Sequence, residues 1–190
     1  KGIAVVCPTY RLYPDAKYPE FIEDGACAVK WVFENMDKYI TAEKIFVGGQ
    51  SAGAYITQNL CFNDKYLRKH GITNEMIAGY FHDAGQPTTH FNVLNERGID
   101  SGRVIIDDAA PLYYIDGKGY YPPMEFVVAA NDIPNRYEQT KLLMSTLKNF
   151  GHEDIKLHVM ENCTHVSYND IMDKYGNPCL TETVYNFLMR

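Results

Sequence analysis

The sequence predicts an α/β protein with a mostly parallel, doubly wound sheet and helices on both of its faces. Short apolar runs rich in β-branched residues alternate with segments of helical periodicity along the chain, which is typical of β-α-β units. The runs are continuously apolar, as expected for strands buried on both faces. With 190 residues, of which 46% are hydrophobic and 22% charged, residues 1–190 have the size and composition of one globular domain.

The first half of the chain predicts two strand–helix pairs. Residues 2–10 (GIAVVCPTY) form a short apolar run that predicts a strand. Residues 19–39 follow with apolar side chains at helical spacing and Pro19 near the first turn. Residues 44–49 (KIFVGG) predict a second strand, and residues 52–62 (AGAYITQNLCF) the helix after it.

The second half continues the alternation. Residues 76–85 predict a third strand and residues 124–132 a fourth. A helix over 135–151 ends at a glycine, as many helices do. Residues 155–165 predict the fifth strand, and residues 180–190 the last helix.

Residues 86–122 interrupt this rhythm. The segment is long for a connection and carries its own predicted helix around residues 101–114. Long insertions between sheet elements commonly serve as lids or binding walls. We therefore expect a cap-like insertion within the single domain.

Composition excludes several classes of function. The net charge of −6 leaves no basic stripe that could neutralise phosphates, which argues against a nucleic-acid partner. No apolar stretch approaches the roughly 20 residues of a membrane-spanning helix.

The five cysteines indicate neither a metal site nor a disulfide framework, because their number is odd and they form no C-x-x-C pair. Cys7, Cys27 and Cys61 lie in apolar segments, so we expect them to be buried thiols. This favours a reducing, cytoplasmic compartment, and no metal or organic cofactor is implied.

The stretch Gly49-Gln50-Ser51-Ala52-Gly53 is the strongest motif in the chain. A G-x-S-x-G sequence between a strand and a helix is typical of a sharp turn that exposes a nucleophilic serine, with glycines where side chains would collide. Ser51 is therefore the predicted nucleophile. The N–H of Ala52, at the start of the helix, is positioned to stabilise an oxyanion.

A serine nucleophile needs a base, and the base needs an orienting carboxylate. Of the six histidines, His165 stands at the carboxyl end of the last predicted strand, where the base is expected. His82 and His90 could line a pocket. The other three are expected to be packed or solvated: His70, His152 and His158.

Asp132 is the predicted acid, because it stands at the carboxyl end of the fourth predicted strand. Asp83, after the third strand, is its rival, since some triads of this architecture use that position. Asp154 and Glu161, before or inside the final strand, are weaker candidates.

Four stretches together resemble a known family. YRLYPDAKYPEFIEDGACAVKWV, GGQSAG, AANDIP and CTHVSY resemble, in this order, segments of the hormone-sensitive-lipase-like and acetylesterase families of α/β-hydrolases. The resemblance covers essentially the whole chain. It implies an α/β-hydrolase fold and carboxylic-ester hydrolysis, with Ser51, Asp132 and His165 as the triad. It also implies that Arg11 and Asp24 support the serine turn from beneath.

One segment of those families has no counterpart here. They carry a His-Gly-Gly segment after the third strand of the sheet, and its amides complete the oxyanion hole. By the resemblance, this sequence begins at the fourth strand and contains strands four to eight. We therefore expect Lys1 not to be the native start of the protein.

The leading hypothesis is a serine hydrolase that cleaves short-chain carboxylic esters through an acyl-enzyme, with an acetylated carbohydrate as one candidate substrate. Gln50, Gln86 and His90 are the candidate substrate-binding residues. Aromatic residues of the insertion are candidates for the pocket wall: Phe91, Tyr113, Tyr114, Tyr120 and Tyr121. Two alternatives stay open: an amide-cleaving serine hydrolase of the aryl-formamidase or peptidase type, and a non-catalytic binding protein of the same fold.

Overall fold

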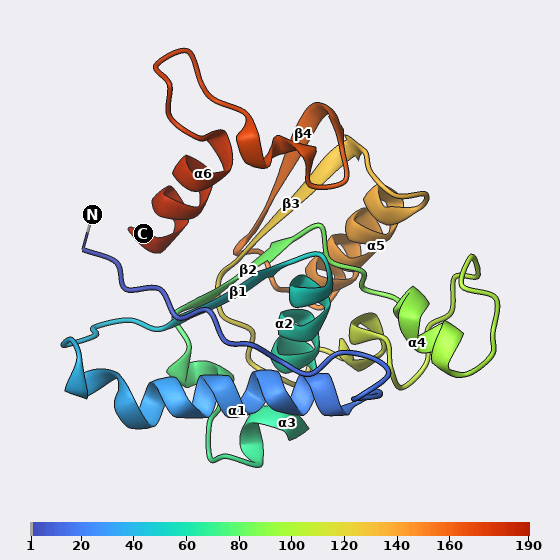
Figure 1. Ribbon diagram of the computed structural model, residues 1–190, viewed down its shortest axis with the longest axis horizontal. Coiled ribbons are helices and arrows are strands. Elements are labelled where there is room, and N and C mark those ends of the chain that lie inside the picture. Colours follow the sequence, from blue (N-terminus) through green and yellow to red (C-terminus); the bar gives the residue numbers. More distant parts are fainter. Residues whose placement is uncertain (1) are drawn as a thin grey trace.

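A four-stranded parallel sheet forms the centre of the protein, of which the computed structural model describes residues 2–190 (Figure 1). The spatial order of the strands follows the chain, and each pairs in parallel with the next. The strands are β1 (Phe46–Gln50), β2 (Gly79–Asp83), β3 (Met124–Asn131) and β4 (Ile155–Thr164). Because all four run in the same direction, the loops at their carboxyl ends gather along one edge of the sheet.

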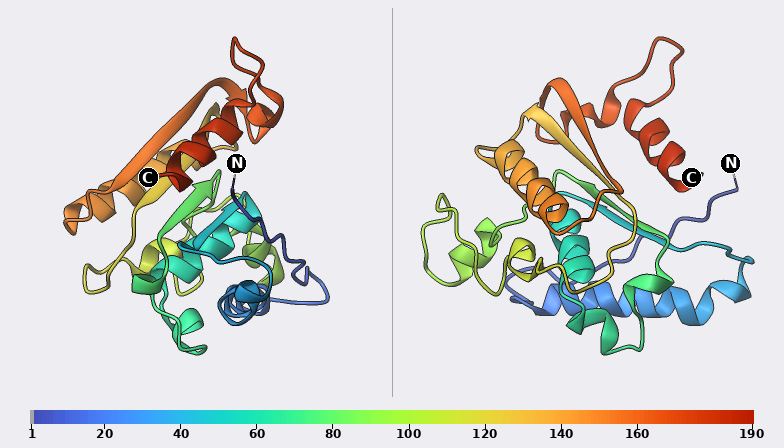
Figure 2. Two further views of the ribbon diagram at one scale, coloured as in Figure 1. Left: turned by 90° about the vertical axis from the view of Figure 1, so that its left-hand side faces the viewer. Right: turned by 180° about the vertical axis from the view of Figure 1, so that it is seen from behind.

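Helices cover both faces of the sheet, which confirms the predicted α/β architecture. On one face α2 (Ala52–Phe62) packs against β1 and β2, and α5 (Arg136–Asn149) packs against β3. The long helix α1 (Glu20–Asn35) packs against α2. The opposite face carries α6 (Cys179–Leu188), and Figure 2 shows it across the sheet from α5.

Short helices complete the fold. Two are α-helical, α3 (Lys65–Arg68) and α4 (Phe91–Glu96). Four are 3₁₀ turns: η1 (Met36–Lys38), η2 (Asn74–Met76), η3 (Pro111–Tyr114) and η4 (Ser167–Asp170).

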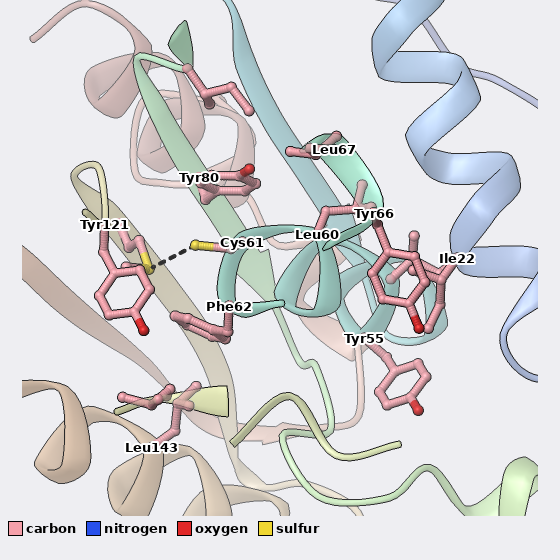
Figure 3. Close-up of a cluster of buried hydrophobic side chains, with 14 of the residues drawn as sticks. Ile22, Tyr55, Leu60, Cys61, Phe62, Tyr66, Leu67, Tyr80, Tyr121 and Leu143 are labelled. Atoms are coloured by element: carbon pink, nitrogen blue, oxygen red, sulfur yellow. Dashed lines mark hydrogen bonds between the residues drawn. The ribbon is translucent and has the colours of Figure 1, made fainter. Parts of the chain in front are cut away.

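The two faces of the sheet bury two separate apolar clusters. The larger cluster lies between α1, α2, α5 and the sheet, and Figure 3 shows its central side chains, among them Ile22, Leu60 and Tyr80. The smaller cluster lies under α6, where the ring of Phe187 packs against Phe46 and Phe81. Burial of this apolar surface is what holds the helices on the sheet.

The predicted strand over residues 2–10 is wrong. These residues form no strand in the structure, and Ile3, Val5 and Val6 are exposed. Within residues 2–190, β1 is an edge strand that pairs only with β2. An apolar run adopts a strand only where a neighbouring strand supplies its hydrogen bonds, and residues 2–10 have no such partner. The sheet of the described chain therefore has four strands, not five, and Lys1 lies outside the described residues.

The predicted helix around residues 101–114 is also largely wrong. Only its end is helical, as η3, and α4 forms earlier in the insertion. The side chain of His90 caps α4 by accepting the N–H of Asn92. Asp107 Oδ1 accepts bonds from the N–H of Ala109 and the hydroxyl of Thr89, at 2.9 and 2.6 Å. Such side-chain bonds to the backbone favour turns over a continuous helix.

The cysteines differ from expectation in two of three cases. Cys61 is buried, but Cys7 and Cys27 are exposed. Cys7 belongs to the segment that does not join the sheet, and Cys27 lies on the outer side of α1. No helix among residues 2–190 has the length and apolar character needed to cross a membrane.

Adjacent leucines on α5 test the packing of the larger cluster. Leu143 is fully buried, whereas Leu142 is 49% exposed. We expect Leu143→Ala to lower the free energy of unfolding by about 2–5 kcal/mol, because it removes buried methyl groups and leaves a cavity. Leu142→Ala is the matched control and should change it by less than about 0.5 kcal/mol. Equal losses in urea unfolding would contradict the assigned core.

Candidate active site

The carboxyl edge of the sheet carries the predicted nucleophile, the predicted base and the two leading candidates for the acid. Ser51 directly follows β1, and Asp83 is the last residue of β2. Asp132 follows β3, and His165 follows β4. Four stretches far apart in sequence are thereby brought to one place by the parallel sheet alone.

Ser51 occupies a strained turn between β1 and α2. Its φ of 54° and ψ of −113° lie outside the conformations that non-glycine residues favour. Its N–H donates to the carbonyl oxygen of Asp83 at 2.7 Å, and its own carbonyl accepts the N–H of Tyr55 at 3.0 Å. Gly49 permits the turn, since a Cβ there would lie 2.4 Å from the backbone carbon of Gly53.

A chain of hydrogen bonds links Ser51, His165 and Asp132. Ser51 Oγ lies 2.8 Å from His165 Nε2, and His165 Nδ1 lies 2.7 Å from Asp132 Oδ1. The arrangement leaves Nε2 of a neutral imidazole free to accept the serine proton, provided that Nδ1 carries the hydrogen shared with the carboxylate. The three residues chosen from sequence therefore lie in the geometry that nucleophilic catalysis requires.

The carboxylate of Asp132 is held by its own backbone as well as by His165. Its side chain is 1% exposed. Oδ1 accepts the N–H of Ile133 at 2.7 Å, and Oδ2 accepts the N–H of Ala129 at 3.3 Å. Hydrogen bonds of this kind stabilise a buried ionised carboxylate and fix its orientation.

The rival acid, Asp83, has different partners. It is buried, and its carboxylate accepts hydrogen bonds from the hydroxyl of Tyr168 and from Gln50 Nε2, the latter at 2.6 Å. Burial raises the pKa of Asp83, and the hydrogen bonds from Tyr168 and Gln50 partly oppose that rise. The geometry therefore favours Asp132 over Asp83 as the partner of the histidine.

Ala52 is the first residue of α2, as predicted. The N–H groups of the first turn of a helix have no acceptor within the helix. The Ala52 N–H therefore remains available for a ligand oxygen next to Ser51. Its assignment as an oxyanion donor stays a prediction.

The candidate substrate-binding residues are largely engaged within the protein. Gln50 joins Asp83 and Asn169 through its amide group. Gln86 is buried, donates to the carbonyl of Thr89 and accepts a hydrogen bond from Arg136. Contact of these two side chains with substrate stays a prediction.

His90 is buried as well, and its imidazole packs against the rings of Tyr55 and Phe91. The other aromatic candidates of the insertion differ in their exposure. Tyr113 and Tyr120 are exposed, Tyr114 is partly buried against the larger cluster, and Tyr121 packs edge-on against Phe62 in the core. Contact of any of these side chains with a ligand stays a prediction.

Arg11 and Asp24 form a bidentate ion pair with each other. Arg11 Nε and Nη2 lie 2.9 and 2.8 Å from the two oxygens of Asp24. The Arg11 side chain is 53% exposed, and the hydrogen bond from Arg11 lowers the pKa of Asp24. The pair anchors the segment before α1, and its support of the serine turn stays a prediction.

Sequence reasoning overlooked three residues that surround the site. Tyr168 and Asn169 lie in η4, shortly after His165, and bond to Asp83 and Gln50. Arg136, buried at the start of α5, donates to the carbonyl of Ala84, the residue after Asp83. Their partners are distant in sequence, so no local pattern indicates them. Within residues 2–190 no group of three or more His, Cys, Asp or Glu side chains is placed to hold a metal ion.

Residues 1–169 match the family model described as alpha/beta hydrolase fold. The chain belongs to this family. The match includes every residue of the Ser51, Asp132 and His165 arrangement.

Individual relatives agree with this assignment. Over 70 residues the chain is 34% identical to the acetyl esterase of Salmonella paratyphi B, a match covering 35% of this chain and 22% of that protein. The chain thus matches about a fifth of the length of its curated relatives.

Solved structures show the same fold. The propionate-bound esterase Est2 of Thermogutta terrifontis superposes with a TM-score of 0.70 at 17% identity, covering 95% of this chain and 69% of that one. Esterase B of Lactobacillus rhamnosis gives a TM-score of 0.68 at 16% identity, covering 95% of this chain and 62% of that one. These neighbours confirm the α/β-hydrolase fold that the sequence predicts.

The two glycines of the serine turn should respond differently to an added methyl group. We expect Gly49→Ala to destabilise the protein by about 1–3 kcal/mol, because its Cβ would overlap the backbone of α2. Gly53→Ala is the control, since its Cβ would meet nothing within 4 Å and alanine favours a helix by up to about 1 kcal/mol. Thermal unfolding measures both, and equal destabilisation would contradict the described turn.

His82 gives the fold a pH dependence. Burial among aromatic rings lowers its pKa from 6.5 to about 3. An unfolded chain binds this proton below pH 6.5 and the folded chain does not until about pH 3, so His82 makes stability fall as the pH falls through that window. The slope is up to about 1.4 kcal/mol per pH unit.

His82→Phe should therefore flatten the stability profile between pH 6.5 and 4. Phenylalanine keeps an aromatic ring beside Tyr80, Phe62 and Phe126, and cannot be protonated. His90, whose pKa burial lowers to about 4, supplies a remaining slope of the same sign in both proteins. Urea unfolding at a series of pH values checks this, and parallel profiles for the two proteins would refute it.

Proposed function

We propose that the chain carries the catalytic residues of a serine esterase that cleaves short-chain carboxylic esters through an acyl-enzyme. The observation that carries the proposal is the continuous hydrogen-bonded arrangement of Ser51, His165 and Asp132 on a strained strand-to-helix turn. A serine in an ordinary glycine-rich turn is not expected to have a strained backbone or a histidine aligned with its hydroxyl.

The proposed reaction begins with attack of Ser51 Oγ on the ester carbonyl carbon. His165 Nε2, 2.8 Å away, takes the hydroxyl proton as the new C–O bond forms. Asp132 holds the imidazole with Nδ1 facing its carboxylate and stabilises the positive charge that develops. His165 then gives the proton to the leaving alcohol, and the acyl group remains on Ser51.

Hydrolysis of the acyl-enzyme repeats these steps with water. His165 accepts a proton from the water molecule as it attacks the acyl carbon, and the proton returns to Ser51 as the acid leaves. In both halves negative charge collects on the former carbonyl oxygen. The Ala52 N–H, at the positive end of α2, is the donor within this chain that we assign to that oxygen.

The relatives support the proposed class of bond. The matched Salmonella proteins are named acetyl esterases, and Est2 of Thermogutta terrifontis has been solved with propionate and with butyrate bound. Another Est2 structure is phosphoramylated by tabun, and Esterase B has been solved inhibited by a tributyrin phosphonate. Short acyl chains are therefore the substrates that we propose for this chain.

Covalent labelling and turnover together test the proposal. We expect a fluorophosphonate to add one phosphonyl group to the protein, and p-nitrophenyl acetate to be hydrolysed. Ser51→Ala should abolish labelling, since it removes the attacking oxygen. His165→Ala and Asp132→Asn should each slow hydrolysis on the order of 10³–10⁴-fold or more, because they remove or misorient the base.

Intact-mass measurement and peptide mapping identify the labelled residue. A phosphonyl group on any residue other than Ser51, or undiminished hydrolysis by Ser51→Ala, would overturn the proposal. Formamide and aminoacyl-anilide substrates, compared with p-nitrophenyl acetate, decide between ester and amide bonds. Faster turnover of an amide would keep the triad and overturn the esterase assignment.

A further inference from the structure

Asp83 lies beside the proposed triad but is not part of it. It ends β2, between β1 and β3, and is 3% exposed. The position opposite His165 Nδ1 is taken by Asp132. A second buried carboxylate at this edge of the sheet is costly unless hydrogen bonds replace its lost hydration.

The backbone carbonyl and the carboxylate of Asp83 accept hydrogen bonds from two different loops. Its backbone carbonyl accepts the N–H of Ser51 at 2.7 Å, and carboxylate Oδ2 accepts from Gln50, the residue before Ser51, at 2.6 Å. The other oxygen, Oδ1, accepts the hydroxyl of Tyr168, which lies three residues after His165 and is fully buried. One residue thus binds both the serine turn and the segment that carries the histidine.

A second link runs between the same two segments. Gln50 Nε2 donates to Asn169 Oδ1 at 2.8 Å, and Asn169 Nδ2 donates back to Gln50 Oε1 at 3.1 Å. Gln50 therefore uses its amide to join Asp83 to Asn169, next to Tyr168. The bonds form a closed network around Asp83.

Both loops need such support. Ser51 has a φ of 54°, and Val166, directly after His165, has a φ of 53°. Backbone in this region costs a non-glycine residue roughly 1–3 kcal/mol and persists only where its surroundings hold it. If either loop relaxed, the 2.8 Å contact between Ser51 Oγ and His165 Nε2 would be lost.

We propose that Asp83 is a positioning residue, whose carboxylate holds the Ser51 turn and the His165 loop at the separation that proton transfer requires. This inference rests on the proposed function of Ser51 and His165. Asp83 acts through Gln50 and Tyr168 and does not itself touch the reacting atoms.

The test compares the maximal rate of fluorophosphonate labelling with the half-saturating concentration of the reagent, in Asp83→Asn and in wild type. Asparagine keeps the shape but presents an N–H₂ group to Gln50 or Tyr168, which both donate. We expect the maximal rate to fall about 10–100-fold, as small misplacements of reacting groups do. The half-saturating concentration should stay unchanged, because Asp83 does not contact the reagent.

A double-mutant cycle separates positioning from a general structural role. Tyr168→Phe removes the hydroxyl that binds Asp83 and should also slow labelling. Because the two residues act through one bond, the double variant should be no slower than Asp83→Asn alone. Asp170→Asn, an exposed change in the same η4 turn, is the matched control and should label like wild type.

The outcomes distinguish this inference from the proposed function. Labelling that survives Ser51→Ala, or a wild-type protein that neither labels nor hydrolyses p-nitrophenyl acetate, would overturn both. Loss of labelling in Ser51→Ala with a wild-type rate in Asp83→Asn would overturn only the role of Asp83. So would a changed half-saturating concentration at an unchanged maximal rate, or a strictly additive cycle. If Asp83→Asn does not fold, Tyr168→Phe decides: a wild-type rate there would refute the inference.

Discussion

The hydrogen bond from the Ser51 N–H to the Asp83 carbonyl governs the geometry of the site. It extends the ladder between β1 and β2 by one step beyond the last pair, Gln50 and Asp83. The chain therefore remains tied to the sheet up to the serine and must turn sharply to begin α2 at Ala52. The turn can be this tight because Gly49 allows α2 to lie against the strand.

The same edge of the sheet holds two buried carboxylates with different partners. Asp132 receives two backbone N–H bonds and one from His165, while Asp83 receives bonds from Tyr168 and Gln50. Burial, and to a smaller extent the neighbouring Asp132, makes ionisation of Asp83 costly and raises its pKa. Hydrogen bonds that suit each carboxylate separately offset this cost and give the two residues distinct roles in the geometry.

The segment after β2 is bonded to α5 beside the site. Arg136 donates to the carbonyl of Ala84 and to Gln86, and Thr88 donates to Gln139 of α5 at 3.1 Å. Burial lowers the pKa of Arg136 because it disfavours the charged guanidinium. The hydrogen bonds to these neighbours compensate part of the cost of burying that charge. Hydrogen bonds thereby fasten residues 84–88 to α5.

Local sequence determined the elements and the residues whose roles depend on near neighbours. The α/β alternation, the helices α1, α2, α5 and α6, and the serine turn follow from periodicity and from glycines within a few residues of Ser51. Placing Asp132 and His165 after strands was enough to bring them together, because parallel strands deliver their carboxyl ends to one edge.

Tertiary structure alone decided what depends on distant partners. Asp132 and Asp83 both follow strands, and only the fold shows that His165, 33 residues from Asp132, turns to one of them. The sequence does not indicate the role of Tyr168, because its partner Asp83 lies 85 residues away along the chain. Residues 2–10 and 101–114 have the composition of a strand and a helix. Among residues 2–190 the first has no strand to pair with, and the second is held in turns by Asp107. Propensity describes what a segment can form on its own, whereas hydrogen-bond partners supplied by the rest of the chain decide what it does form.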